Sequence, residues 1–189
     1  MSGPFPPYAL FVLSESIDAD YINAVIRRVF ESEGSVAYKL SLVTGLDYSC
    51  VPKKRYIDIG DGEKREDIPP GTSPSMPSSF QSPFAGKTLQ ECASYMRDTP
   101  SDAAWQTEYF CTLDENDKSE DTIMLVRRFK NEDGTAVHAF PEPTGSVTQF
   151  IINYIGDDWE DKMKRYKRVA SKSGKEDRSV GVPFEFAQS

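Results

Sequence analysis

The sequence is poor in histidine and cysteine, which excludes several kinds of catalytic site. His138 is the only histidine among 189 residues, so a metal site with several histidine ligands cannot form, and a Ser-His-Asp or Cys-His mechanism would have to use this residue. The three cysteines, Cys50, Cys92 and Cys111, are widely spaced and contain no C-x-x-C pair. We therefore expect neither a zinc ribbon nor a redox pair, but reduced thiols buried in an intracellular protein.

Patterns that bind phosphate, activate a serine or hold zinc are also missing. The chain contains no G-x-S-x-G, H-E-x-x-H, G-x-G-x-x-G or G-x-x-x-x-G-K-S/T motif. No apolar run approaches the about 18 residues that cross a bilayer, and no basic segment of a signal peptide precedes the first apolar run. The net charge of −8 disfavours general binding of nucleic acids. We expect a cytoplasmic protein with no cofactor, no metal and no membrane contact.

The sequence patterns that are present predict a single α/β domain with a mixed sheet. Residues 8–13 form an apolar run of strand length, residues 36–43 alternate as a strand does, and a helix lies between them. This helix has Ser16 or Asp18 as its N-cap and Gly34 at its end. Its apolar face is formed by Ile22, Val25, Ile26, Val29 and Phe30. The chain therefore opens with a β-α-β unit.

The middle of the chain predicts a strand, a long loop and a helix. Residues 54–60 are strand-like, whereas residues 60–83 are rich in Gly, Pro, Ser and charge. We interpret residues 60–83 as a mobile loop, which is either a tolerated insertion or a lid over a pocket. A capping box formed by Thr88 and Glu91 then opens a helix over residues 88–98. Cys92 lies on the apolar face of this helix, which makes it a poor nucleophile.

Three strands of an antiparallel meander are predicted next, over residues 107–113, 121–129 and 135–140. The second hairpin turn contains Gly134. The acidic stretch 114–121 before the second strand resembles a calcium loop at first sight. However, a loop beginning at Asp114 would place Lys118 and Leu125 where oxygen ligands are required. We interpret this stretch as a turn.

The C-terminal part predicts two helices and a polar tail. One helix begins at Ser146, and a final helix covers residues 157–170. The apolar face of the final helix is formed by Trp159, Met163, Tyr166 and Ala170. Residues 171–180 are predicted to be a flexible tail, and residues 180–186 could return to the sheet as an edge strand.

The final helix carries the two charged clusters that are candidates for a site. Asp157, Asp158, Glu160 and Asp161 could serve acid–base chemistry or hold magnesium, but acids also suit a helix N-terminus and form i, i+4 pairs with the cations that follow. The cluster Lys162, Lys164, Arg165, Lys167 and Arg168 could bind an acidic partner, an RNA strand or a membrane, or could be a solvated face. We interpret both clusters as structural, and His138 in the same way.

The order of these segments resembles an uncharacterised family of small fungal and actinobacterial domains of unknown function. The resemblance rests on FVLSESIDADYINAVI (11–26), SPFAGKTLQE (82–91), YFCTLDENDKSEDTIMLV (109–126), INYIGDDWEDKM (152–163) and GVPFEF (181–186). Residues 60–81 depart from the pattern as an apparent insertion. The resemblance implies the order of the secondary structure elements and no catalytic activity.

Because no recognised catalytic pattern is present, we expect a binding or regulatory module with a protein partner. The alternative is a hydrolase-like enzyme that uses carboxylates in a pocket under the 60–83 loop. Neither the catalytic residues nor the substrate of such an enzyme follow from the sequence.

The interpretation of residues 114–121 can be tested with calcium. Millimolar calcium should leave the Tm unchanged, because a ligand that binds only the folded state raises the Tm by mass action. A saturable rise in Tm that disappears in Asp114→Ala would contradict this interpretation.

Overall fold

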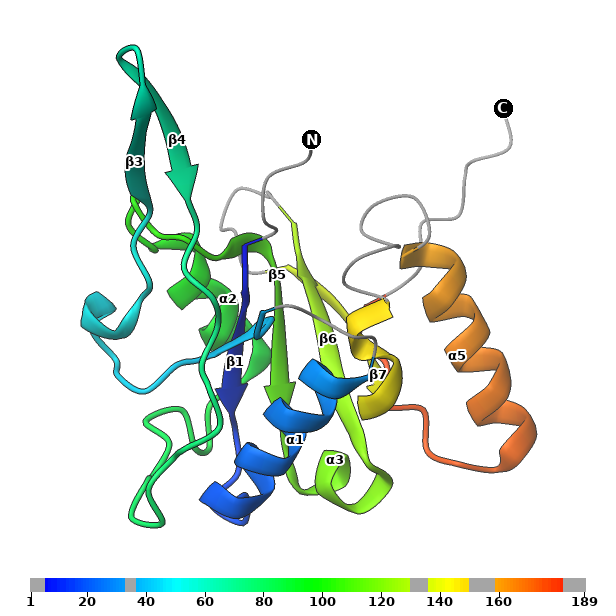
Figure 1. The fold of residues 1–189 in the computed structure, drawn as a ribbon. Coiled ribbons are helices and arrows are strands. Elements are labelled where there is room, and N and C mark those ends of the chain that lie inside the picture. Colours follow the sequence, from blue (N-terminus) through cyan, green and yellow to red (C-terminus); the bar gives the residue numbers. More distant parts are fainter. Residues whose placement is uncertain (1–5, 33–36, 130–135, 150–158, 182–189) are drawn as a thin grey trace, which may run out of the picture.

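The computed structural model describes residues 6–32, 37–129, 136–149 and 159–181. At its centre is a five-stranded sheet with the order β2-β1-β5-β6-β7 (Figure 1). Its strands are β1 (Tyr8–Val12), β2 (Leu40–Leu42), β5 (Gln106–Leu113), β6 (Thr122–Arg128) and β7 (Val137–Pro143). β1 runs parallel to β2 and β5, whereas β5, β6 and β7 are antiparallel to their neighbours. The prediction of a single α/β body with a mixed sheet is confirmed.

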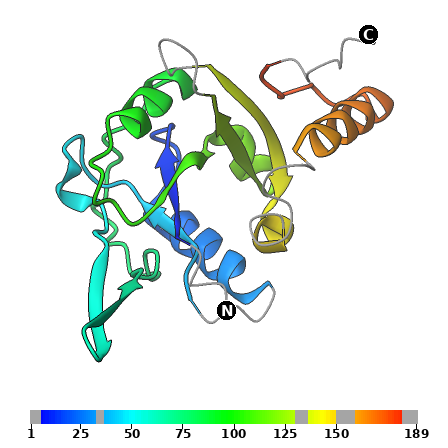
Figure 2. The same ribbon diagram turned by 90° about the horizontal axis from the view of Figure 1, so that it is seen from above.

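The helices cover both faces of this sheet. They are α1 (Ala19–Glu31), α2 (Leu89–Arg97), α3 (Glu115–Glu120) and α5 (Trp159–Ser173), with short 3-10 helices at Tyr48–Cys50 and Thr144–Ser146. α1 and α5 pack on one face and α2 packs on the other (Figure 2). Asp18 is the N-cap of α1, and the predicted capping box of Thr88 and Glu91 opens α2. Within the described residues, no helix is long and apolar enough to span a membrane.

The chain adds strands first on one side of β1 and then on the other. From β1 the chain passes through α1 to β2 on one side, and later through α2 to β5 on the other side of β1. α1 and α2 lie on opposite faces, as right-handed crossovers in opposite directions require. The carboxyl ends of β1 and β5 are therefore adjacent at a topological switch point.

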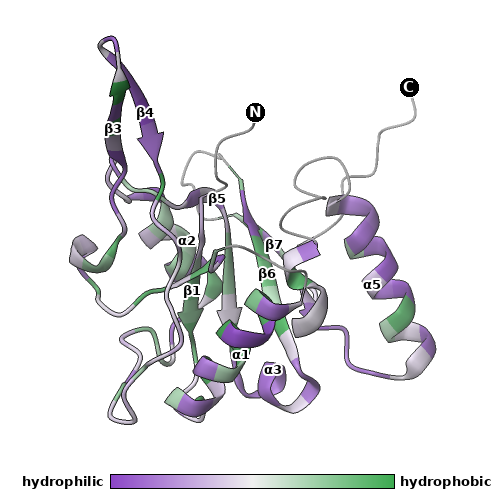
Figure 3. Cartoon of the chain, viewed as in Figure 1, coloured by the Kyte–Doolittle hydropathy of each residue, from purple (hydrophilic) through white to green (hydrophobic). Residues whose placement is uncertain are grey.

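Aromatic packing fixes the two faces of the sheet. On the α2 face, the ring of Phe11 contacts Phe84 at 4.8 Å and Phe110 at 5.4 Å between centroids, both edge to face. On the α5 face, the centroid of the Trp159 ring lies 4.9 Å from that of Phe140 and 5.5 Å from that of Tyr109. Figure 3 shows hydrophobic stretches in the strands of the sheet and a largely hydrophilic α5.

Both edges of the sheet are covered or blocked. At the β2 edge, Gly71 donates its N–H to the Tyr38 carbonyl, and a Cβ at Gly71 would overlap the Leu40 carbonyl oxygen. At the β7 edge, the outward-facing N–H of Ala139 is bonded to Val180. Pro141 and Pro143 have the same orientation along β7 and carry no N–H, so these two positions cannot donate to another strand.

The prediction of a loop over residues 60–83 is wrong in part. Residues 63–67 form β4 (Glu63–Asp67), which pairs with β3 (Arg55–Gly60) in an exposed hairpin that projects from the sheet (Figure 1). β4 has the sequence EKRED, which has no apolar residue to reveal a strand. Further on, Met76 exchanges two hydrogen bonds with the side chain of Asn23 on α1. The segment after β4 is thus attached to the body.

Two other local predictions are corrected. The stretch 114–121 contains α3, a short helix with Asp114 as its N-cap and a reciprocal bond from Asp117, in place of a simple turn. The tail 171–180 begins inside α5, and the side chain of Arg178 is buried. The predicted turn at Gly134, most of the helix from Ser146 and the strand at 182–186 lie outside the described residues.

The packing of Trp159 predicts a large loss of stability when the ring is removed. Trp159 is 1% exposed, so Trp159→Ala should lower the free energy of unfolding by about 3–5 kcal/mol through lost burial and a cavity. Urea denaturation measures this change. Val169→Ala on the same helix is the control, because Val169 is 55% exposed and its change should stay within about 0.5 kcal/mol. Equal effects of the two substitutions would contradict the packing.

Candidate functional site

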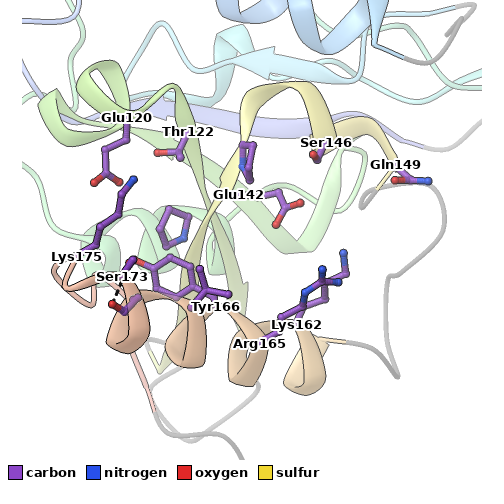
Figure 4. A pocket seen from close by; sticks show the side chains of 14 residues that line it. Glu120, Thr122, Glu142, Ser146, Gln149, Lys162, Arg165, Tyr166, Ser173 and Lys175 are labelled. Atoms are coloured by element: carbon purple, nitrogen blue, oxygen red, sulfur yellow. Dashed lines mark hydrogen bonds between the residues drawn. The ribbon is translucent and has the colours of Figure 1, made fainter.

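A cavity with a volume of about 500 Å³ lies between α5 and strands β6 and β7 (Figure 4). We call it the α5 groove. Its volume is in the range of ligand pockets. Its walls are formed by Glu120, Thr122, Pro141, Glu142, Pro143, Ser146, Gln149, Lys162, Arg165, Tyr166, Val169, Ala170, Ser173 and Lys175.

The α5 groove concentrates cations on a protein that is acidic overall. Lys162 and Arg165 lie one turn apart on α5, which places both on the side that faces β7. Lys175 follows the end of α5 and points toward Glu120 in Figure 4. Within the described residues, Arg165 and Lys175 make no ion pair. Two positive charges are therefore available to a ligand.

Glu142 is the acidic side chain between the cations and the sheet. It projects from β7 toward Lys162 and Arg165 (Figure 4) and is half-buried. Burial raises the pKa of this carboxyl, while the charges of Lys162 and Arg165 act in the opposite direction. Glu142 therefore offsets part of the positive charge that Lys162 and Arg165 bring to the groove.

The middle of the α5 groove is apolar. Pro141 and Pro143 form the wall on β7, and Tyr166, Val169 and Ala170 form the wall on α5. Tyr166 is half-buried and Val169 is 55% exposed. A ligand in the groove would cover this apolar surface and gain free energy from its removal from water.

One end of the α5 groove is closed by a buried charge cluster around Arg178. The guanidinium of Arg178 lies 2.8 Å from Asp117, 3.0 Å from Asp114 and 3.2 Å from Glu120. Its side chain is 8% exposed and that of Asp117 is 0% exposed. The backbone N–H of Arg178 donates to the hydroxyl of Tyr166. The cluster thus fastens the segment after α5 to both α3 and α5.

The local sequence explains why the acids of this cluster converge. Asp114 follows β5 and caps α3, so its side chain accepts the N–H of Asp117, and Asp117 in turn accepts the N–H of Asp114. Asp117 also accepts the hydroxyl of Thr122 on β6. Burial, followed by the charge of Asp114, raises the pKa of Asp117 to about 6, although Arg178 and Thr122 lower it.

The cations predicted as one basic cluster are separated by the structure. Lys162 and Arg165 line the α5 groove, whereas Lys164 and Arg168 are exposed and lie outside it. Lys167 donates to the carbonyl of Gly181. Glu142 was not predicted as a site residue because it lies on β7, and Lys175 and Arg178 were not predicted because their positions depend on the return of the chain after residue 173.

The acidic cluster is also divided. Asp157 and Asp158 lie outside the described residues. Glu160 does not pair with Lys164 as predicted but turns inward, where its carboxylate is 3.5 Å from Nδ1 of His138. Burial lowers the pKa of His138, and the charge of Glu160 opposes this shift. His138 faces α5, and a Cβ at Gly181 would overlap its ring. This environment agrees with the structural interpretation of His138.

The cysteines are free, and two of them are buried. Burial raises the pKa of the Cys92 thiol to about 12 and also raises the pKa of Cys111. Both thiols are therefore protonated at neutral pH and poor nucleophiles. In the described part of the chain, no group of three or more His, Cys, Asp or Glu side chains has a geometry that could hold a metal ion.

Comparisons of the sequence with models of protein families and with curated proteins find no match, and a search of solved structures also finds none. Membership of the uncharacterised family that the chain resembles remains a prediction.

The raised pKa of Asp117 predicts a pH dependence of stability. Its folded-state pKa of about 6 lies above the unfolded value of about 3.9. The protonated carboxyl therefore stabilises the fold fully below a pH of about 4, and this contribution is lost as the pH rises through about 6. About two pKa units correspond to about 3 kcal/mol.

Asp117→Asn provides the comparison, because it keeps an acceptor oxygen and does not titrate. Urea denaturation between pH values of about 4 and about 8 should show wild type losing up to about 3 kcal/mol relative to the variant. A wild-type advantage that grows with pH would contradict the raised pKa and would mean that Arg178 outweighs burial.

Proposed function

We propose that the protein is a binding module that holds an acidic peptide segment of a partner protein in the α5 groove. The observation that carries this proposal is a pair of cations, Arg165 and Lys175, that form no ion pair with any described residue and lie on either side of an apolar floor. Since the protein carries a net charge of −8, a cavity whose lining cations outnumber its acids is a local exception to the overall charge.

The charge of the α5 groove favours carboxylates as its ligands. Three cations, Lys162, Arg165 and Lys175, and two carboxylates, Glu120 and Glu142, are among the lining residues, so the lining of the groove carries a net charge of +1. Glu120 lies 3.2 Å from the guanidinium of Arg178, which also pairs with Asp114 and Asp117. A guanidinium presents a planar set of donors that matches a carboxylate. Extended nucleic acids are disfavoured, because the acidic remainder of the surface would repel their phosphates.

The length of the α5 groove suits a short extended peptide. Arg165 and Ser173, the last residue of α5, are eight residues apart, which corresponds to roughly 12 Å at the rise of a helix, and Lys175 lies two residues further on. An extended peptide covers this distance in four to five residues at about 3.3 Å each. Two acidic side chains at that spacing could reach both cations, with apolar residues between them on Tyr166 and Val169.

The recognition would depend on side chains and not on added β-structure. A peptide that extends a sheet needs main-chain donors from the edge strand. Pro141 and Pro143 of β7 have no backbone N–H, and the N–H of Ala139 already donates to the carbonyl of Val180. The specificity of the proposed module therefore comes from its charges and apolar contacts.

Fluorescence polarisation with labelled peptides of about seven residues tests this proposal, with a Glu near each end at the spacing of an extended chain. We expect saturable binding that weakens with added salt and is lost when both Glu residues are replaced by Gln. The double variant Arg165→Glu and Lys175→Glu should weaken binding at least about tenfold, because it removes both carboxylate partners.

The matched control is the double variant Lys164→Glu and Arg168→Glu. It makes the same change in net charge on the same helix but outside the α5 groove, so its Kd should change less than about threefold. Equal losses in both double variants would mean that only the overall charge matters. Either that result or the absence of peptide binding would contradict the proposal.

The alternative of a hydrolase-like enzyme has less support. A smaller cavity does lie beside residues 80–85, at the end of the segment predicted as a lid, but Glu15 is the one carboxylate among its described lining residues. A mechanism with two carboxylates would need a second acid there. We also propose a cytoplasmic location, which free thiols fit because that compartment is reducing.

A further inference from the structure

A second cavity, of about 310 Å³, lies at the carboxyl end of β1. Its walls come from the segment between β1 and α1, with Ser14, Glu15 and Ile17, and from the segment that leads into α2, with Phe80, Gln81 and Ser82. Because it shares no lining residue with the α5 groove, it is a separate candidate site.

The position of this cavity is the one at which open α/β sheets bind ligands. Ligands of such sheets bind outside the carboxyl ends of the strands, where the strand order reverses. Here the reversal occurs at β1, and the segments that enter α1 and α2 from opposite faces meet over its carboxyl end.

The walls of the cavity are held by hydrogen bonds to the end of β1. The hydroxyl of Ser82 donates to the carbonyl of Val12 at 2.6 Å, and the N–H of Gly86 donates to the carbonyl of Leu13 at 2.8 Å. On the other wall, the N–H of Ser16 donates to the hydroxyl of Ser14 at 3.2 Å. The cavity is therefore built before any ligand arrives, which lowers the entropic cost of binding.

We propose that this cavity binds a neutral sugar ring. The amide of Gln81 can donate and accept hydrogen bonds, as the hydroxyl groups of a sugar do, whereas the hydroxyl of Ser82, which already donates to Val12, offers an acceptor lone pair. Glu15 can accept bonds from two neighbouring hydroxyls, and Phe80 and Ile17 offer an apolar surface to the C–H face of the ring.

The charge around the cavity disfavours an anionic ligand. Its described lining residues include one carboxylate, Glu15, and no cation. Of the nearby charges, Lys118 is already paired with Asp18 at 2.7 Å, and the pKa of Glu115 is lowered by hydrogen bonds from its own backbone and from Ser14. A phosphate or carboxylate at this place would meet two acids and no available cation.

Two-dimensional NMR titration of the full chain with methyl glycosides of glucose, galactose, mannose and N-acetylglucosamine tests this inference. At least one glycoside should bind saturably, with shifts at the amides of residues 14–17 and 80–85. Glu15→Gln should weaken this binding at least about tenfold, because it removes a charged acceptor. Phe80→Ala should do the same, with thermal denaturation to verify that the variant is folded.

The matched controls are Asp20→Asn, which removes an acid from the first turn of α1 outside the cavity, and Tyr56→Ala, which removes an exposed aromatic ring from β3. Both should leave the glycoside Kd unchanged. The inference is overturned if no glycoside binds, if Glu15→Gln binds as wild type does, or if inorganic phosphate produces the same shifts. These outcomes do not depend on whether a peptide binds the α5 groove, because the two cavities share no lining residue.

Discussion

The arrangement of α5 on the sheet depends on the ion pairs of one buried guanidinium. Arg178 is placed among Asp114, Asp117 and Glu120 with 8% of its side chain exposed, and a charge with so little access to water is tolerated only when it is paired. Three acids surround one cation, so the cluster retains excess negative charge. Burial, followed by the charge of Asp114, raises the pKa of Asp117. Removal of the guanidinium would leave a buried carboxylate without a charged partner.

The same residues hold the Arg178 cluster together and form the α5 groove. Glu120 and Thr122 bond to Arg178 and also line one end of the groove, and the hydroxyl of Tyr166 accepts the N–H of Arg178 beside its apolar floor. The groove therefore has the shape of a preformed site. Its electrostatic character follows from its lining, in which Lys162, Arg165 and Lys175 outnumber Glu120 and Glu142.

The elements that could be predicted from the sequence are those with a periodic apolar pattern. The strand at 8–13, the helix with Ile22 and Val25 and the three-stranded meander were predicted because each buries one face or both. β4 was missed because its exposed residues are all charged, and α3 because its capping residues resemble those of a turn.

The candidate site could not be predicted, because its parts are distant in sequence. Glu142 on β7 and Lys175 after α5 are distant in sequence but line the same α5 groove. The i, i+4 spacing of Glu160 and Lys164 suggested a surface ion pair, but burial of α5 against His138 rotates Glu160 inward. Local spacing gives the helix, whereas the packing of the helix decides which of its charges face a ligand.

The β3–β4 hairpin is anchored at its base and adds little to either core. Lys54 bonds to the Asp102 carbonyl just before β3, and Thr72 bonds to β2 soon after β4, while most residues between them face solvent. Mutations in this hairpin are thus nearly neutral for folding. Evolution is free to change its length and sequence faster than those of the sheet, and a protein engineer could insert a foreign peptide at its tip without disturbing either cavity.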